Sequence, residues 1–401
     1  MQTRYGLPPE VKFCSLCVIS NQRPSSVPEH LNKPGDKKPT IEFDDEGVCS
    51  ACRYAEKKKR IDWSEREEQL QMLLRQYRSK QGNFDCIVPG SGGKDSFYAA
   101  HMLKHKYGMH PLLVTWSPTI FTDWGWRNLV RWQSISTHRL YTPNREVHRL
   151  LTRLSVEHLF HCFQPFILGQ KNLAPKVAIE TGIPLTIYGE AEAEYGSPIA
   201  ETTTAQRDKR YFTLRDYSDV HLGGVSLADL NSEFHLQWSD VEPYLPADQK
   251  DIERVGVDVR YLGFYLKWKP QECYYYACEH GGFERSPHRT PGTYSAYNSL
   301  DDQTDDVHYL QTYIKFGIGR ATYDAAQEIR SGDITREEGV ALVRRFDGEY
   351  PERFEKEVFE YLSVDGFPPM TREYFWYLAD KFRSPHLWTK ESGEWRLRYI
   401  V

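Results

Sequence analysis

A glycine-rich stretch that follows a short apolar run constrains the fold more than any other part of this chain. The run 85–88 (DCIV) predicts a buried strand, the stretch 90–96 (GSGGKDS) predicts a tight turn, and the residues after it have a helical pattern. Three glycines let the backbone turn sharply and present N–H groups to an anion. Ser91 and Ser96 add hydroxyl groups, and Lys94 supplies a positive charge. The segment is therefore predicted to hold a chain of phosphates at the start of a helix.

The order of residues in this stretch differs from that of the Walker A loop, which places four residues between its first glycine and a terminal Gly-Lys-Ser/Thr. Here an acid, Asp95, follows the lysine. The order from Ser91 to Ser96 resembles instead the pyrophosphate loop of the ATP pyrophosphatases. Those enzymes cleave ATP between its α and β phosphates and pass AMP to an oxygen of the acceptor. A surface turn rich in glycine and serine is the simpler alternative, but the strand, turn and helix signals agree.

Apolar runs alternate with helical patterns along residues 62–190. Strands are predicted at 111–116, 138–141 and 183–190, and helices at 62–80, 97–107, 126–137, 145–170 and 173–180. This alternation is typical of an α/β fold with a doubly wound parallel sheet and helices on both faces. Because ligands of such sheets collect at the carboxyl ends of the strands, we expect Thr115, Trp116, Gly189 and Glu190 to lie beside the glycine-rich loop.

Four of the eight cysteines form two CxxC pairs near the N-terminus, Cys14 with Cys17 and Cys49 with Cys52. In a chain of this length eight cysteines do not indicate a disulfide scaffold, and paired cysteines more often hold a metal. Four thiolates close the tetrahedral shell of zinc, so we assign this zinc to folding and not to chemistry. An iron–sulfur cluster with the same ligands and two unrelated reduced pairs are the alternatives.

The length of 401 residues allows two or three structural units. We expect a zinc-binding unit at 1–60, a nucleotide-binding domain at 61–200 and a mainly helical region at 201–401 that binds the substrate or a partner. In the last region the helical patterns cover 201–211, 251–256, 309–316, 323–331, 336–347 and 352–362, and 286–306 is loop-like.

The net charge of −5 argues against non-specific nucleic-acid binding as the main role. The chain has no run of about 18 apolar residues and no N-terminal pattern of a secretion signal. The sequence therefore predicts a cytoplasmic protein with neither nucleic acid nor a membrane as its partner.

Motifs spread over nearly the whole chain resemble the N-acetyl sugar amidotransferases, relatives of the ATP pyrophosphatases that act on precursors of bacterial surface polysaccharides. Ala191 departs from the resemblance, because an asparagine is usual at its position. The matching segments are the two CxxC pairs, 89–96, 188–190, 194–196, 261–263, 315–322, 328–332 and 335–338.

The resemblance implies a specific reaction in lipopolysaccharide O-antigen synthesis. An acetamido group of a UDP-linked diacetamido sugar becomes an acetamidino group, with ATP activating the amide and ammonia supplying the new nitrogen. Transfer of AMP to the amide oxygen turns a poor leaving group into a good one. No glutaminase signature occurs in the chain, so the resemblance implies separate glutaminase and cyclase-like subunits that supply the ammonia.

This chemistry assigns roles to the predicted site residues. Lys94, Asp95 and Glu190 are the catalytic candidates, and Asp95 is also the candidate ligand for Mg²⁺. Lys315 and Arg320 are candidates for contacts to the sugar acid or its diphosphate. The candidate ATP-binding residues are Gly90, Ser91, Gly92, Gly93, Lys94, Asp95, Ser96, Thr115, Trp116 and Gly189.

Simpler roles remain open for several of these residues. Asp95 could serve only as an acid at a helix N-terminus, and Glu190 could form a structural salt bridge. Thr115 and Trp116 could simply belong to the core and end the strand. Lys315 and Arg320 could be ordinary charges on solvated helices.

Two other functions compete with the amidotransferase. A tRNA thiolase also joins a pyrophosphate loop to zinc cysteines. Such an enzyme usually needs a catalytic cysteine, and Cys162 is the candidate for it. The other alternative is a zinc-stabilised module that binds nucleotide without catalysis.

Overall fold

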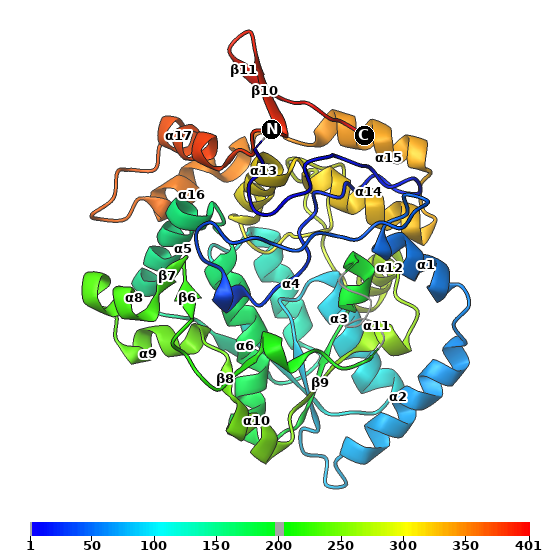
Figure 1. Cartoon of the computed structure of the whole chain (residues 1–401). Coiled ribbons are helices and arrows are strands. Elements are labelled where there is room, and N and C mark those ends of the chain that lie inside the picture. The colour runs from blue at the N-terminus through cyan, green and yellow to red at the C-terminus, as the bar shows by residue number, and fades with distance from the viewer. Residues whose placement is uncertain (1, 197–203) are drawn as a thin grey trace.

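A parallel sheet of five strands forms the centre of the fold in the computed structural model, which describes residues 2–196 and 204–401 (Figure 1). The strands lie in the order β3-β2-β1-β4-β9, and every neighbouring pair is parallel. Their bounds are β1 Cys86–Pro89, β2 Pro111–Trp116, β3 His138–Tyr141, β4 Leu185–Tyr188 and β9 Asp258–Tyr261. The strand order reverses at β1, which lies between β2 and β4. A crevice at the carboxyl ends of β1 and β4 is where such sheets bind ligands.

Successive residues of the central strands face two separate hydrophobic cores. Val88 and Leu113 pack with helix α3 (Lys94–His101), while Ile87 and Leu112 pack with helix α6 (Gln164–Thr181). Helices therefore cover both faces of the sheet, and the α/β architecture with a central parallel sheet is confirmed. On the α3 face lie α4 (Asp123–Gln133) and α12 (Pro270–Gly281), and on the α6 face lie α5 (Arg145–Leu159) and α10 (Gln249–Val255).

Several predicted elements occur with shifted bounds. The helix expected at 62–80 is α2 (Trp63–Tyr77), which begins after Asp62, whose carboxylate accepts from the N–H groups of Ser64 and Glu65. The helix expected at 97–107 begins earlier, at Lys94, and its last part is a π-helical turn, η2 (Met102–Lys106).

The single helix expected at 145–170 is wrong, because the chain forms α5 and α6 with a break between them. Phe160 has a left-handed backbone with φ of 49° and ends α5, and α6 begins at Gln164 and continues to Thr181. The helix expected at 201–211 is also wrong for its described part, since only η4 (Lys209–Tyr211) is helical there and 201–203 lie outside the described residues.

Short elements connect β4 to β9 within the sheet, and α11 follows β9 on the way to a mainly helical C-terminal region. The connecting elements are η3 (Glu192–Tyr195), β5 (Thr213–Leu214), β6 (His221–Leu222), β7 (Val225–Ser226), α8 (Leu227–Phe234), α9 (Trp238–Val241), η5 (Glu242–Tyr244), β8 (Ala247–Asp248) and α11 (Leu262–Tyr265). The C-terminal elements are α13 (Asp305–Phe316), α14 (Arg320–Ser331), α15 (Arg336–Phe346), η6 (Glu352–Phe354), α16 (Glu355–Leu362), α17 (Arg372–Phe382), β10 (Trp388–Glu391) and β11 (Glu394–Leu397).

The N-terminal segment contains η1 (Glu29–Leu31) and α1 (Ser50–Lys58) and otherwise consists of turns and isolated bridges. Its buried side chains form one cluster with Ala325 of α14 and Val343 of α15. The sheet also takes its edge strand β9 from beyond residue 200. The boundaries at 60 and 200 remain predictions.

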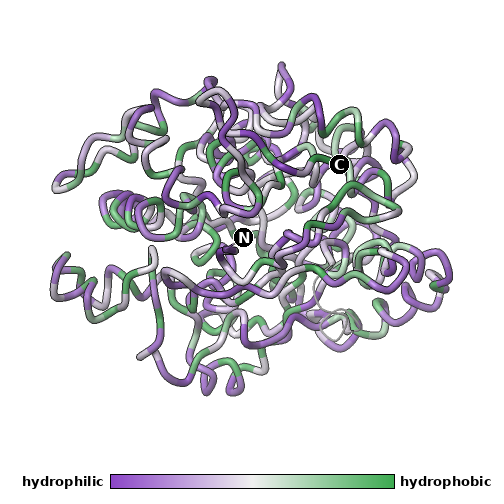
Figure 2. The backbone as a smooth tube through the Cα atoms, turned by 45° about the horizontal axis from the view of Figure 1, so that its top comes forward, coloured by the Kyte–Doolittle hydropathy of each residue, from purple (hydrophilic) through white to green (hydrophobic). Residues whose placement is uncertain are grey.

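Hydrophobic residues occur in short stretches spread over the chain and not in one long segment (Figure 2). Among the helices of the described residues, none has the length and apolar character needed to cross a membrane.

Candidate active site

The glycine-rich loop connects β1 to α3 and is shaped by close packing. A Cβ atom on Gly90 would lie 2.1 Å from the Cβ of Ser96, and one on Gly92 would lie 2.7 Å from the backbone of Leu129. Gly92 also has a positive φ of 83°, which side chains rarely adopt. Both positions therefore require glycine.

The N-terminus of α3 is open to an anion. Gly93 is its N-cap residue, and no side chain caps the first turn. The Ser96 hydroxyl donates to the Gly93 carbonyl oxygen at 3.0 Å, and the indole of Trp132 donates to the Ser96 carbonyl at 3.1 Å. The first-turn N–H groups and the helix dipole are thus available to phosphate.

A buried charge cluster lies at the carboxyl ends of β1 and β4. Lys94 is 6% exposed, and its Nζ lies 2.5 Å from Oδ2 of Asp95. Glu190 follows β4 and lines the same cavity as Tyr195. Burial acts to lower the pKa of Lys94, but the carboxylates of Asp95 and Glu190 raise it above its usual value. Burial raises the pKa of Glu190 to about 7, and the Asp95 carboxylate adds to this effect.

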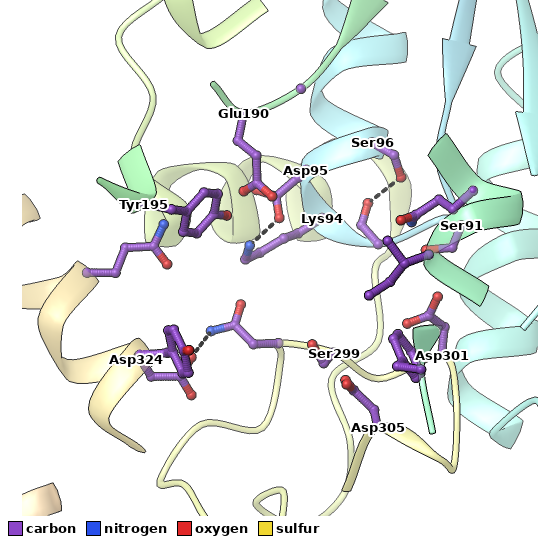
Figure 3. A pocket seen from close by; sticks show the side chains of 18 of the residues that line it. Ser91, Lys94, Asp95, Ser96, Glu190, Tyr195, Ser299, Asp301, Asp305 and Asp324 are labelled. Carbon is purple, nitrogen blue, oxygen red and sulfur yellow. Dashed lines mark hydrogen bonds and ion pairs between the residues drawn. The ribbon is translucent and has the colours of Figure 1, made fainter. Parts of the chain in front are cut away.

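These groups face a cavity of about 650 Å³ (Figure 3). The loop 90–96 and the residues after β4 line one part of it, and α6, α13 and α14 line other parts. Ile41 and Ala51 of the N-terminal segment also reach its wall. The cavity therefore joins the predicted nucleotide site to the C-terminal helices.

Aspartates lie across the cavity from the Lys94 and Asp95 pair (Figure 3). Asp301 lines the cavity on this side, and burial raises the pKa of its carboxyl group. Burial also raises the pKa of Asp305 to about 7, against the effect of the Arg320 guanidinium. Carboxylates at and before the start of α13 therefore face the loop across the cavity.

Arg320 lines the cavity, but two carboxylates already balance its positive charge. It is 3% exposed, its Nε lies 3.4 Å from Asp324 and its Nη1 lies 3.7 Å from Asp305. Nη1 also donates to the Ser299 hydroxyl at 2.8 Å. The predicted anion contact of Arg320 would have to compete with two carboxylates.

Besides Gly92 of the loop, three residues predicted to bind ATP or the sugar do not line the cavity. The Thr115 hydroxyl donates to the Gly90 carbonyl at 2.5 Å, so it braces the loop from behind. Trp116 is buried against α6, where a Cβ on Gly169 would lie 2.0 Å from its ring. Lys315 is buried, and its Nζ donates to the Leu159 carbonyl at the end of α5 at 2.7 Å. The geometry therefore favours structural roles for these three side chains.

The four N-terminal cysteines form a buried cluster whose sulfur atoms all lie within 4.8 Å of one another. Cys14 and Cys52 are 3.8 Å apart at sulfur, and so are Cys17 and Cys49. A tetrahedron with Zn–S bonds of about 2.3 Å has edges of about 3.8 Å, so these four residues fit zinc. The N–H groups of Leu16, Cys17 and Cys49 also donate to Cys14 Sγ at 3.4 Å, which suits a thiolate.

The surroundings of Asp95 fit a magnesium ion. Its Oδ1 atom is buried and has no hydrogen-bond partner within the described residues, while Oδ2 contacts Lys94. Asp95 and Glu190 line the same cavity beside the loop. Carboxylate oxygens beside bound phosphates are the usual ligands of Mg²⁺.

Cys162, the residue on which the sulfur-transfer alternative depends, is 1% exposed. Its Sγ donates to the Thr304 carbonyl at 3.6 Å, and burial raises its pKa well above the usual value. No cysteine is among the described residues that line the cavity. A thiol held in this way is a poor nucleophile.

The sequence interpretation missed most of the far wall of the cavity. Asp301 and Asp305 belong to an acidic run at 301–306 (DDQTDD) within the segment described as loop-like, and this density of acids was a usable signal. Lys171 and Arg207, which also line the cavity, lie in stretches with no distinguishing pattern.

Two comparisons with known proteins bear on this site. Residues 291–400 match the family model described as "LPS biosynthesis protein WbpG-like, C-terminal domain". The C-terminal region is thus WbpG-like. The match includes α13 and α14, which line the cavity, and it links this region to lipopolysaccharide biosynthesis.

A second similarity is to the uncharacterized protein MJ1599 of Methanocaldococcus jannaschii. The two chains are 28% identical over 101 residues, which is 25% of this chain and 31% of the relative. The aligned part thus spans less than a third of the relative's length.

Proposed function

We propose that this chain is an ATP-dependent amidotransferase that converts an acetamido group of a UDP-linked diacetamido sugar to an acetamidino group in lipopolysaccharide O-antigen synthesis. The observation that carries the proposal is that one cavity is lined both by the loop 90–96 and by α13 and α14 of the WbpG-like region. A phosphate-binding loop that faces a polysaccharide-biosynthesis domain suits an ATP-dependent step on a polysaccharide precursor.

The reaction proceeds in two steps. The amide oxygen attacks the α phosphorus of ATP, the new O–P bond forms as the bond to pyrophosphate breaks, and an imidate carrying AMP results. Ammonia then forms a C–N bond at the imidate carbon and loses a proton, and AMP leaves with the electron pair of the C–O bond. The covalent activation divides one difficult displacement into two easier ones.

The residues of the cavity suit these steps. The open N–H groups of α3 and the ammonium of Lys94 would hold the phosphates that leave as pyrophosphate. Asp95 and Glu190 would hold Mg²⁺, which neutralises the charge on the leaving group. Tyr195 lines the cavity beside Glu190.

The source of the ammonia belongs to the same proposal. Separate glutaminase and cyclase-like subunits would deliver it, so the isolated chain would use ammonium salts but not glutamine. Efficient use of glutamine by this chain alone would contradict that part.

A direct test incubates the protein with a panel of UDP-linked diacetamido sugars, ATP, Mg²⁺ and ammonium. Mass spectrometry should show a sugar nucleotide lighter by about one mass unit, because NH replaces O, together with equal amounts of AMP and pyrophosphate. Release of ADP, or absence of AMP with every sugar of the panel, would refute the proposal.

Variants assign the activity to this cavity. K94M should lower the rate of AMP formation about 100-fold or more, because it removes a charge that stabilises the leaving pyrophosphate. K106M is the matched control, since Lys106 lies beyond α3 and contacts Glu67 at 2.8 Å outside the cavity. Equal rates for the two variants would place the reaction elsewhere.

A further inference from the structure

The cavity contains a second cationic group that the ATP-binding loop does not use. Lys171 of α6 and Arg207 both line it. Their charged groups lie against the same aromatic ring, with Lys171 Nζ 5.3 Å and Arg207 Cζ 5.7 Å from the ring centre of Tyr211. Two cations that share one ring repel each other unless an anion lies between or beside them.

Lys171 has an ammonium group without a paired anion. No described residue forms a salt bridge or hydrogen bond with its Nζ, and Glu192 and Glu29 are the carboxylates that act on it from a longer distance. Burial lowers its pKa, and the Arg207 guanidinium lowers it further. A lysine held in this way gains from any anion that enters the cavity.

Arg207 supplies the second, independent observation. Its side chain is only 5% exposed, and Glu192 accepts from Nη2 at 3.4 Å. Its Nε atom is buried and has no hydrogen-bond partner within the described residues. A buried guanidinium N–H is costly to leave without an acceptor, so a ligand oxygen is the expected partner.

The two cationic parts of the cavity belong to opposite faces of the sheet. The loop 90–96 leads into α3, which packs on one face, and Lys171 belongs to α6, which packs on the other. Arg207 lies over the ring of Tyr188, the last residue of β4, at 4.8 Å. Glu190 follows Tyr188 by two residues and thus lies at the edge between these two parts.

We propose that Lys171 and Arg207 form a second phosphate subsite, which holds the diphosphate of the nucleotide-linked sugar while the loop holds the phosphates of ATP. This assignment rests on the proposed function, because only an acceptor that itself carries phosphates requires two such sites. A diphosphate has two negative charges and several acceptor oxygens, which match one ammonium and one guanidinium N–H. The acceptor would enter from the α6 side and present its sugar towards Glu190.

The test measures the binding of UDP by calorimetry with the ATP site blocked by saturating α,β-methylene-ATP and Mg²⁺. K171M and R207M should each weaken UDP binding about tenfold or more, because each removes a charge-assisted contact. K171R keeps the charge and should keep most of the affinity, whereas R207K keeps the charge without the Nε–H group and should keep only part of it; both separate loss of contact from loss of folding. K176M is the matched control, since Lys176 lies on the same helix but contacts Glu242 at 2.8 Å.

Three outcomes would overturn the assignment. UDP could fail to bind the wild-type protein when the analogue is present, or it could bind K171M and R207M as tightly as K176M. Affinity for α,β-methylene-ATP could also fall in these variants by the same factor as that for UDP, which would make the group part of the ATP site. The proposed function is tested separately by AMP formation, so an intact UDP subsite without amidine product would refute only the reaction.

Discussion

Replacement of Gly90 by alanine should damage the phosphate loop without unfolding the sheet. The added Cβ would lie 2.1 Å from Ser96 Cβ, 2.6 Å from Ser96 Oγ and 3.2 Å from the ring of Trp132. Since carbon atoms in contact prefer about 3.5 to 4.0 Å, the loop and the start of α3 must separate by roughly 1.5 Å. Strain from overpacking of this kind costs about 1–3 kcal/mol. A displacement of about 1 Å at a reacting group can cost about 100-fold in rate.

The cause of the damage can be separated from a general loss of stability. The S96G substitution removes the two atoms that the new methyl group approaches most closely, so the double variant G90A/S96G should recover at least about tenfold of the lost rate. S96G alone is the reference, because glycine in a helix costs about 1 kcal/mol by itself. The assay is AMP formation beside calorimetric affinity for α,β-methylene-ATP. The packing argument would be refuted if G90A kept both its affinity and its rate within twofold of the wild type. It would also be refuted if the double variant formed AMP no faster than G90A.

Three further predictions address the zinc cluster, a buried histidine and a buried lysine. C49S should lose zinc and unfold several °C earlier, because metal binding contributes to folding, whereas C278S should keep its zinc; metal analysis and thermal melts check this. His148 is buried beside the Tyr244 hydroxyl, 3.0 Å from Nδ1, and burial lowers its pKa from 6.5 to about 4. Its neutral form stabilises the fold fully above pH 6.5, and this contribution is lost as the pH falls towards 4. Between pH 7 and pH 5 the wild type should therefore lose about 2 kcal/mol more stability than H148Q in urea titrations, and equal losses would contradict the burial argument. K315M should leave the affinity for UDP within about twofold, because Lys315 contacts a backbone carbonyl and not the cavity; a tenfold loss would restore its predicted role.

Local chemistry explains what the sequence predicted well. The loop 90–96 and the two CxxC pairs are short segments whose residues act on their own neighbours, so their spacing alone indicates a tight turn from strand to helix and a four-sulfur cluster. Periodicity likewise located the strands that carry them, since β1 and β2 are buried on both faces.

Contacts between distant residues explain what the sequence did not predict. Lys315 could point to solvent or inward, and its partner Leu159 lies 156 residues away. The break at Phe160 also has no local signal, because a phenylalanine at positive φ is held there by tertiary packing with Phe375 and Phe382. The subsite of Lys171 and Arg207 forms only because the fold brings both side chains to the ring of Tyr211.

The N-terminal segment that carries the four cysteines is connected to the cavity through one short helical turn. The Ser50 hydroxyl at the start of α1 donates to the Gly196 carbonyl at 2.9 Å, and Lys58 at its end forms a 2.5 Å ion pair with Glu194. These contacts hold η3, which begins two residues after Glu190 and carries Tyr195, another residue of the cavity wall. α1 begins directly after Cys49 and contains Cys52, so the cysteine cluster determines where this helix lies. A zinc ion that takes no part in the reaction would thus still set the position of Glu190, and its partial removal should lower the rate of AMP formation before the fold is lost.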